Sequence, residues 1–203
     1  MTKKLIPLIV VAALIVVILG VFTILGWDNL AADLKYQYLD NYDEKTNSSS
    51  ISWYIGLDSD ITIPRKIYDV NITKIGGTFS KAHPDRLTSV TMNDNIVEID
   101  SNAFSWGCVN LTNVTFSNKL TKIGNNAFNG CTALRSVTIP DGVQDIGATT
   151  FANCTALTSV SLPDSVTSID ATAFNGSENV VVTYKGNSYD YEHIADLVAL
   201  TAA

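Results

Sequence analysis

From Leu87 onward the chain repeats itself at an almost constant interval. Successive units begin at Leu87, Leu111, Leu134, Leu157 and Val180, so the steps are 24, 23, 23 and 23 residues. A period in this range indicates a solenoid, because one short unit cannot bury its own apolar face and must stack on its neighbours. No other feature of the sequence constrains the fold as strongly.

The apolar residues keep the same phase in each unit. The third and fourth units show this in the set Leu134, Val137, Ile139, Val143, Ile146 and Phe151, matched by Leu157, Val160, Leu162, Val166, Ile169 and Phe174. The L-x-x-V-x-L opening predicts a short strand, which a following proline ends because proline cannot donate to a ladder. We expect the I-G/D-x-x-A-F stretch to return as a short helical or irregular segment.

The full pattern, L-x-x-V-x-L-P-x-x-V-x-x-I-G-x-x-A-F-x-x-C, resembles the BspA-like leucine-rich-repeat family of microbial surface proteins. The resemblance covers about residues 61–192. Within it, residues 61–80 are similar to a degenerate first unit, and residues 179–203 to a closing strand and terminal helix. The resemblance implies a secreted or surface-exposed binding protein, often an adhesin, without enzymatic activity or a cofactor.

The predicted fold class is therefore mainly β: a leucine-rich-repeat solenoid of about four 23-residue units with terminal caps, preceded by a long hydrophobic α-helix. The expected segments are a cytoplasmic stub and hydrophobic helix (1–26), an amphipathic stalk and linker (27–50), an amino-terminal cap and degenerate repeat (51–86), the repeats (87–179), and the closing strand and helix (180–203).

Residues 5–26 carry no charge. As a helix they would extend about 33 Å, enough to span a bilayer core. The stretch is longer than the apolar region of a secretory signal peptide, which favours an uncleaved signal anchor over a cleaved signal. Lys3 and Lys4 precede it, so we expect a cytoplasmic amino terminus and an extracellular repeat domain at the cell surface.

The hydrophobic helix is expected to continue to about residue 44. Apolar residues recur there at spacings of three and four, namely Trp27, Leu30, Ala31, Leu34, Tyr38 and Tyr42, before the linker-like TNSSS at 46–50. This face could lie against the domain or membrane, or it could mediate self-association. In the second case the layout is similar to a type IV pilin-like filament subunit, although the sequence lacks that family's cleavage-site glycine or alanine and its glutamate.

A nearly uncharged array of small polar side chains is expected on the outer face of the strands. Its members are Thr88, Ser89 and Thr91; Thr112, Asn113 and Thr115; Arg135, Ser136 and Thr138; and Thr158, Ser159 and Ser161. This array is the candidate binding face for an extracellular protein or glycan. A passive solvated face gives the same pattern, and an ice- or mineral-binding surface is a third interpretation.

Three cysteines recur near one repeat position, at Cys108, Cys131 and Cys154, with Ser177 in the fourth unit. A metal site would need close ligand pairs, and no histidine accompanies this spacing of about 23 residues. We predict small buried side chains that complete the core, rather than a disulfide between adjacent units or a metal site.

Other reactive residue types are scattered. Asp94, Asp141 and Asp164, with Asn118, follow the strands, where turn capping is favoured over cation binding. Neither His83 nor His193 belongs to a hydrolase motif. We therefore predict neither catalytic nor metal-binding residues.

The formal net charge is −7, which argues against a nucleic-acid partner. An extracellular domain would also expose acceptors for N-glycosylation. The N-x-S/T motifs lie at Asn47, Asn71, Asn110, Asn113, Asn153 and Asn175.

Overall fold

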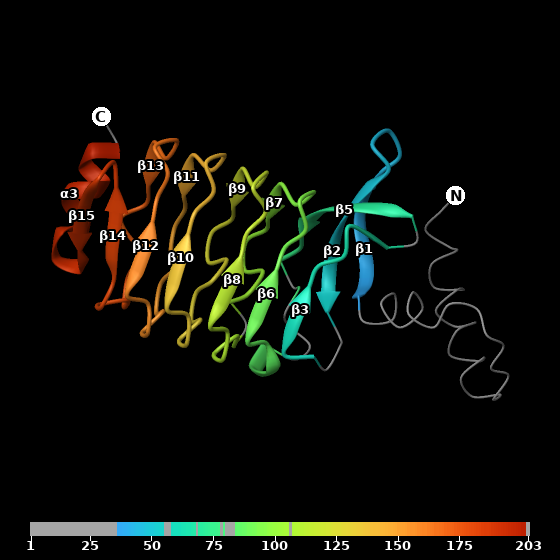
Figure 1. Ribbon diagram of the computed structural model, residues 1–203, viewed down its shortest axis with the longest axis horizontal. Coiled ribbons are helices and arrows are strands. Elements are labelled where there is room, and N and C mark those ends of the chain that lie inside the picture. Colours follow the sequence, from blue (N-terminus) through green and yellow to red (C-terminus); the bar gives the residue numbers. More distant parts are fainter. Residues whose placement is uncertain are drawn as a thin grey trace, which may run out of the picture. The chain divides into compact units, whose positions relative to one another are not determined.

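A computed structural model describes residues 36–54, 58–67, 69–77, 79, 84–105 and 107–201. Within these residues the chain forms a leucine-rich-repeat β-solenoid of about five turns, here called rungs (Figure 1). Each rung runs through a strand of row A, a strand of row B, and a loop that returns the chain to row A. The repeat and the solenoid predicted from it are confirmed.

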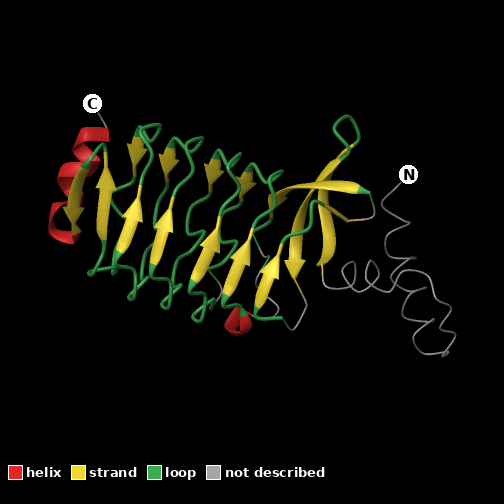
Figure 2. Cartoon of the chain, in the orientation of Figure 1, coloured by secondary structure: helices red, strands yellow, loops and turns green. Residues whose placement is uncertain are grey.

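Row A contains β3 (Asp60–Thr62), β6 (Ser89–Thr91), β8 (Asn113–Thr115), β10 (Ser136–Thr138), β12 (Ser159–Ser161) and β14 (Val181–Tyr184). Row B contains β2 (Ser48–Tyr54), β5 (Val70–Ile75), β7 (Glu98–Ile99), β9 (Lys122–Ile123), β11 (Asp145–Ile146) and β13 (Ser168–Ile169). Rungs 1 to 5 thus begin at β3, β6, β8, β10 and β12. Figure 2 shows both rows with the loops between them. Part of the return segment, which was expected to be helical or irregular, instead forms the strands of row B. These strands form because their isoleucines pair in register, as at Ile99 and Ile123.

The core follows the repeat. The central valine of each A strand in rungs 2 to 5 is buried, while its two neighbours are more exposed. A column of buried rings begins with Tyr54 at the end of β2 and continues through the return loops, here called the Phe loops, with Phe79, Phe104, Phe128, Phe151 and Phe174. Successive ring centroids lie 6.0, 5.6, 5.1, 5.5 and 5.9 Å apart. These contacts join every rung to the next through the interior.

Strand pairing is interrupted at one boundary. Row A divides into β3-β6-β8 and β10-β12-β14, and row B into β2-β5-β7-β9 and β11-β13. In the described part of the chain, no ladder joins β8 to β10 or β9 to β11. Both rows therefore break between rungs 3 and 4, and this boundary is called the seam.

At the amino-terminal end the expected helical stalk is wrong for residues 36–43, which form strand β1 (Tyr36–Asp43). β1 pairs antiparallel with β2, and the segment expected as a TNSSS linker becomes their turn and the start of β2. Tyr38 and Tyr42, which belong to the predicted helical face, are four residues apart and therefore also fit a period of two. The strand is favoured over the helix because its partner β2 also pairs with β5 and so extends row B.

The short strand β4 (Lys66–Ile67) pairs with β5, and the 3₁₀ turn η2 (Pro84–Arg86) precedes rung 2. At the carboxyl end, β14 pairs antiparallel with β15 (Asn187–Asp190). A 3₁₀ turn, η3 (Tyr191–His193), leads into helix α3 (Ile194–Thr201), which buries Ile194 and Leu197 against the last rung. The predicted closing strand and terminal helix are confirmed, and they shield the last open edge of the stack.

The predicted hydrophobic span, residues 5–26, lies outside the described residues, as do residues 27–35 of the predicted stalk. Within the described part of the chain, no helix is long and apolar enough to cross a membrane.

Candidate binding face

The predicted face lies on row A. In β8, β10 and β12 the residues on either side of the buried valine are exposed, and in β6 they are partly exposed. The two positions form two lines of small polar side chains along the stack, here called the A-face. One line is Ser89, Asn113, Ser136 and Ser159, and the other is Thr91, Thr115, Thr138 and Ser161.

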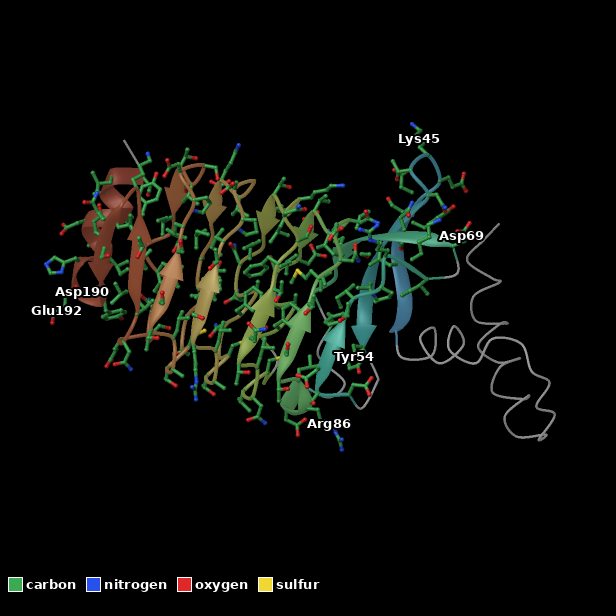
Figure 3. The ribbon with its side chains drawn as sticks, viewed as in Figure 1. Lys45, Tyr54, Asp69, Arg86, Asp190 and Glu192 are labelled. Carbon is green, nitrogen blue, oxygen red and sulfur yellow. The ribbon has the colours of Figure 1, made fainter. Side chains whose placement is uncertain are left out.

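The A-face extends beyond the predicted residues at both ends. Parallel pairing places Asp60 beside Ser89 and Thr62 beside Thr91 in rung 1. At the other end, β14 adds Val181 and Thr183 to the same two lines. Figure 3 shows the side chains along the stack, from Tyr54 near the amino-terminal end to Asp190 and Glu192 at the other. The first of these extensions was detectable from the I-T-I sequence at 61–63, which repeats the alternation of the later strands.

The third predicted line, Thr88, Thr112, Arg135 and Thr158, has a different role. Thr112 Oγ1 donates to the carbonyl oxygen of Thr88 at 2.9 Å, and Thr158 Oγ1 donates to that of Arg135 at 3.2 Å. Thr88 Oγ1 donates to Asp60 Oδ1 at 2.8 Å. These hydroxyls link rungs 2, 3 and 5 to the rung before each of them, so their first use is structural.

None of the three cysteines forms a disulfide bond, and all three are fully buried. Cys131 Sγ donates to the carbonyl oxygen of Phe104 at 3.5 Å, and Cys154 Sγ to that of Phe128 at 3.2 Å. Ser177 Oγ makes the same contact with Phe151 at 2.7 Å, which explains how serine replaces cysteine. The predicted packing role is confirmed, and Cys131, Cys154 and Ser177 each also make a hydrogen bond between rungs.

Burial suppresses the chemistry of these thiols. It raises the pKa of Cys154 to about 12, and it raises that of Cys131 well above its ordinary value, with the two neighbouring cysteines adding to the effect. A thiol needs its thiolate form to bind a metal or attack a disulfide. Among the described residues, no group of three or more His, Cys, Asp or Glu side chains could hold a metal ion.

Row B carries the main ion-pair network. Lys74 Nζ lies 2.8 Å from Asp100 Oδ1 and 3.4 Å from Glu98 Oε2, and Lys122 Nζ lies 2.6 Å from Glu98 Oε1. Burial alone would raise the pKa of Glu98, but the two lysines outweigh it and lower this pKa. This network was not predicted from the sequence, and its signal is the alternation of charge at Lys74, Glu98 and Lys122, which share one repeat position.

The turns after the A strands are capped one residue earlier than expected. Asn93 Oδ1 accepts from the backbone nitrogen of Asn95 at 2.7 Å, and Ser117 Oγ accepts from that of Lys119 at 3.1 Å. Proline occupies this position in the next two rungs. Asp94, Asp141 and Asp164 are exposed beside it, and Asp94 pairs with Arg65.

The N-x-S/T motifs differ in how their amide groups are used. The side-chain nitrogens of Asn47, Asn110 and Asn153 donate to Asp69 O, Asp85 O and Asn129 Oδ1, respectively. Asn175 is exposed, but the hydroxyl of its motif belongs to buried Ser177. Asn113 is exposed on the A-face and Asn71 is partly buried in β5. Glycosylation at these motifs stays a prediction.

The two histidines lie apart from the A-face. His193, in η3, is exposed and its Nδ1 lies 2.6 Å from Asp190 Oδ1. This contact raises the pKa of His193 and lowers that of Asp190. His83 lies outside the described residues.

Comparison with known proteins identifies the repeat. A family model for the BspA type leucine-rich-repeat region matches residues 59–183, in six copies. No curated protein matches the chain. The crystal structure of a leucine-rich-repeat protein of T. pallidum aligns with a TM-score of 0.55 and 22% identity, covering 73% of this chain and 78% of that one. A leucine-rich-repeat protein from Eubacterium ventriosum aligns with a TM-score of 0.53 and 19% identity, covering 70% of this chain and 41% of that one.

Proposed function

Because this chain belongs to the BspA-type leucine-rich-repeat family, we propose that it is a non-catalytic cell-surface protein that binds or adheres to an extracellular protein or glycan. The observation that carries the proposal is the A-face. It offers two aligned lines of polar side chains on a rigid scaffold, and in rungs 3 to 5 these side chains are exposed.

The chemistry of the A-face suits recognition. Its hydroxyl and amide groups both donate and accept hydrogen bonds, and they carry no charge that would have to be desolvated on binding. The backbone beneath them is fixed by ladders within each half of the stack, so little conformational entropy is lost when a partner docks. Arg135 adds one cation at the edge, next to β10.

The proposal places residues 5–26 in the membrane and the repeats outside the cell. Its support is the length of the uncharged run and the two lysines before it. The pilus-like alternative rests on the same amino-terminal residues, and no observation on the described residues favours it.

Protease treatment of intact cells tests the placement. The full-length chain should fractionate with membranes and lose its repeat domain to external protease. Protection of the repeats in intact cells, together with digestion after lysis, would contradict an extracellular location. Regular fibres of this chain in sheared surface material would instead support the filament.

Site-specific photocrosslinking on intact cells tests the face. A photoreactive residue at Ser136, on the A-face, should give discrete adducts with extracellular molecules. The same residue at Gln144, which is exposed next to row B, is the matched control. Equal adducts from both positions, or none from Ser136, would argue against the A-face as the binding surface.

A further inference from the structure

At the seam, row B lacks backbone hydrogen bonds that form at its neighbouring boundaries. Gly124 N donates to Ile99 O at 2.8 Å, and Asp170 N donates to Ile146 O at 2.8 Å. The equivalent bond at the seam would join Gly147 N to Ile123 O, and it is absent from the hydrogen bonds of the described residues. Backbone donors and acceptors require a partner, so these two groups are available to water or a ligand.

The rungs on either side of the seam are still held together. Asn126 N donates to Ala148 O at 3.0 Å and Phe128 N donates to Thr150 O at 2.9 Å in the Phe loops. The rings of Phe128 and Phe151 stack at 5.5 Å. The open strand edges are therefore held at a fixed separation by an intact part of the stack.

Phe116 distinguishes the packing beside the seam from that in the other rungs. It follows β8 at the position that Met92, Ile139 and Leu162 occupy in other rungs, and its ring packs edge-on against Phe128 at 5.8 Å. Unlike those three residues it is only partly buried. An aromatic ring therefore stands where the other rungs have smaller side chains, and the packing beside the seam differs from that at the intact boundaries.

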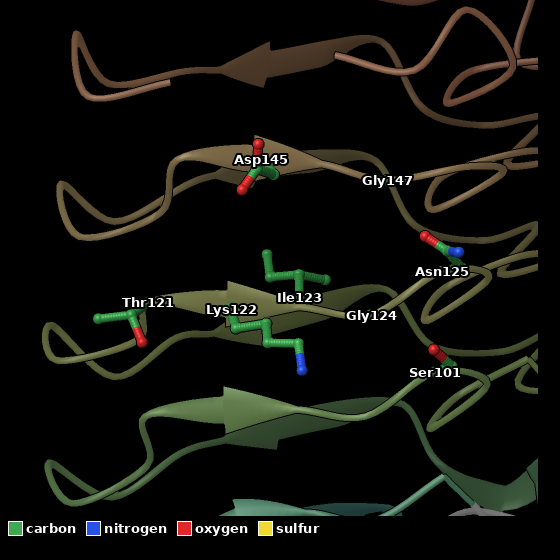
Figure 4. A pocket seen from close by; sticks show the side chains of 8 residues that line it. All are labelled: Ser101, Thr121, Lys122, Ile123, Gly124, Asn125, Asp145 and Gly147. Atoms are coloured by element: carbon green, nitrogen blue, oxygen red, sulfur yellow. The ribbon is translucent and has the colours of Figure 1, made fainter. Parts of the chain in front are cut away.

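A cavity of about 300 Å³ lies at the seam on the row B side (Figure 4). Its lining includes Lys122 and Asp145 from the two facing strands, and Ser101 and Asn125 where the strands pass into the Phe loops. This volume is at the lower end of the range for ligand pockets and exceeds the volume of one sugar ring. The backbone of Gly147 lies close to the side chain of Asn125, because a Cβ atom at Gly147 would be only 2.2 Å from Asn125 Oδ1.

The lining of the cavity contains two charged side chains, Lys122 and Asp145. Lys122 is paired with Glu98 across the intact β7–β9 boundary. Asp145 takes the next place in the row, and within the described residues it has no ion pair. The wall therefore offers the paired ammonium group of Lys122 and the solvated carboxylate of Asp145. It also offers an amide, a hydroxyl, and the backbone groups that make no hydrogen bond across the seam. Such a surface disfavours anions and matches a neutral molecule that both donates and accepts hydrogen bonds.

We propose that the seam cavity binds a single neutral sugar ring, either a free monosaccharide or the terminal unit of a glycan, with Asp145, Asn125 and the open backbone groups of Ile123 and Gly147 as its hydrogen-bonding partners. The site lies on row B, so it goes beyond the binding function proposed for the A-face. Substitutions at the two surfaces therefore separate the two proposals.

Saturation-transfer NMR on the full chain in detergent micelles tests the site. The probes are glucose, galactose, mannose and N-acetylglucosamine, each with its methyl glycoside, which distinguishes a free sugar from a glycan terminus. We expect transfer to at least one probe, with a Kd on the order of 1 mM for so small a ligand. Asp145→Asn should reduce the signal at least about fivefold, a loss of about 1 kcal/mol at RT ln 5.

The matched control is Asp164→Asn, which changes an exposed carboxylate one rung further on that does not line the cavity. It should leave the signal unchanged, and thermal melts should confirm that both variants fold. Amide exchange gives a second measurement: saturating sugar should slow exchange at Gly147 and not at Gly124. Absence of transfer to every probe, or equal transfer to wild type and Asp145→Asn, overturns the proposal.

Discussion

The A-face and the Phe loops use similar small polar side chains in opposite ways. On the A-face, Ser159 and Ser161 flank a buried valine and are exposed to solvent. In the Phe loops, Ser177 is fully buried and bonds both Phe151 O and Cys154 N, at 2.7 and 2.9 Å. The two kinds of serine differ in whether the hydroxyl can reach a backbone carbonyl of the previous rung. Polar residues of the loops should therefore stabilise the fold, and those of the A-face should serve binding.

The largest effect is expected from Phe128→Ala. The ring is fully buried between Phe104 and Phe151, with centroids at 5.1 and 5.5 Å. Its loss should lower the free energy of unfolding by about 3–5 kcal/mol, because it leaves a cavity in the aromatic column. Urea denaturation measures the change, and a loss below about 1 kcal/mol would show that the column is not the main support of the stack.

Ser177→Ala should have the next largest effect. It leaves the Cys154 amide and the Phe151 carbonyl without their partner in a buried site, at a cost of about 2 kcal/mol. Ser177→Cys should lose less, since Cys131 and Cys154 make the same contact with a carbonyl in their own rungs. Equal losses in the two variants would mean that the hydrogen bond contributes little and that volume dominates.

Glu98→Gln should destabilise the protein by about 1 kcal/mol near neutral pH, a modest value because the network is partly solvated. The pKa of Glu98 is lowered in the folded state from its ordinary value of 4.5. Its contribution is therefore present above about pH 4.5 and is lost as pH falls through the lower folded value. Denaturation from pH 7 to pH 3 should show the difference between wild type and Glu98→Gln shrinking, and a constant difference would contradict this account.

The smallest effect on stability is expected on the A-face. Thr138→Ala and Ser161→Ala, which change neighbouring exposed residues, should each alter the free energy of unfolding by less than about 0.5 kcal/mol. Together they should reduce crosslinking from Ser136. Loss of stability comparable to that of Ser177→Ala would remove the distinction between the two surfaces.

The repeat predicted the solenoid, the outward side chains of β8, β10 and β12, and the burial of the cysteines, because each follows from residues that recur in phase. Contacts between rungs were harder to predict. Neither the donation from Thr112 to Thr88 nor that from Cys154 to Phe128 is visible in the sequence, since each joins residues 24 or 26 positions apart. Local spacing does not specify which carbonyl a side chain reaches.

The amino-terminal strand and the seam show two other limits of sequence patterns. Tyr38 and Tyr42 of β1 fit the helical and the strand periods equally, and only the partner strand β2 decides between them. At the seam, Phe116 takes the position that Met92, Ile139 and Leu162 occupy in other rungs, so it keeps the apolar pattern while changing the side-chain volume. A pattern of apolar and polar residues shows which positions are apolar, but it does not show the volume of the side chain that each position needs.

The interrupted ladders also have a mechanical consequence. At an intact boundary, tension along the stack would be shared by parallel hydrogen bonds in row A, row B and the Phe loops. At the seam, neither row contributes a ladder, so the load falls on the Phe loops and the neighbouring corner, where Ala133 N bonds Val109 O. A molecule tethered at one end and pulled at the other should therefore extend first between rungs 3 and 4, while the ladders on either side remain intact.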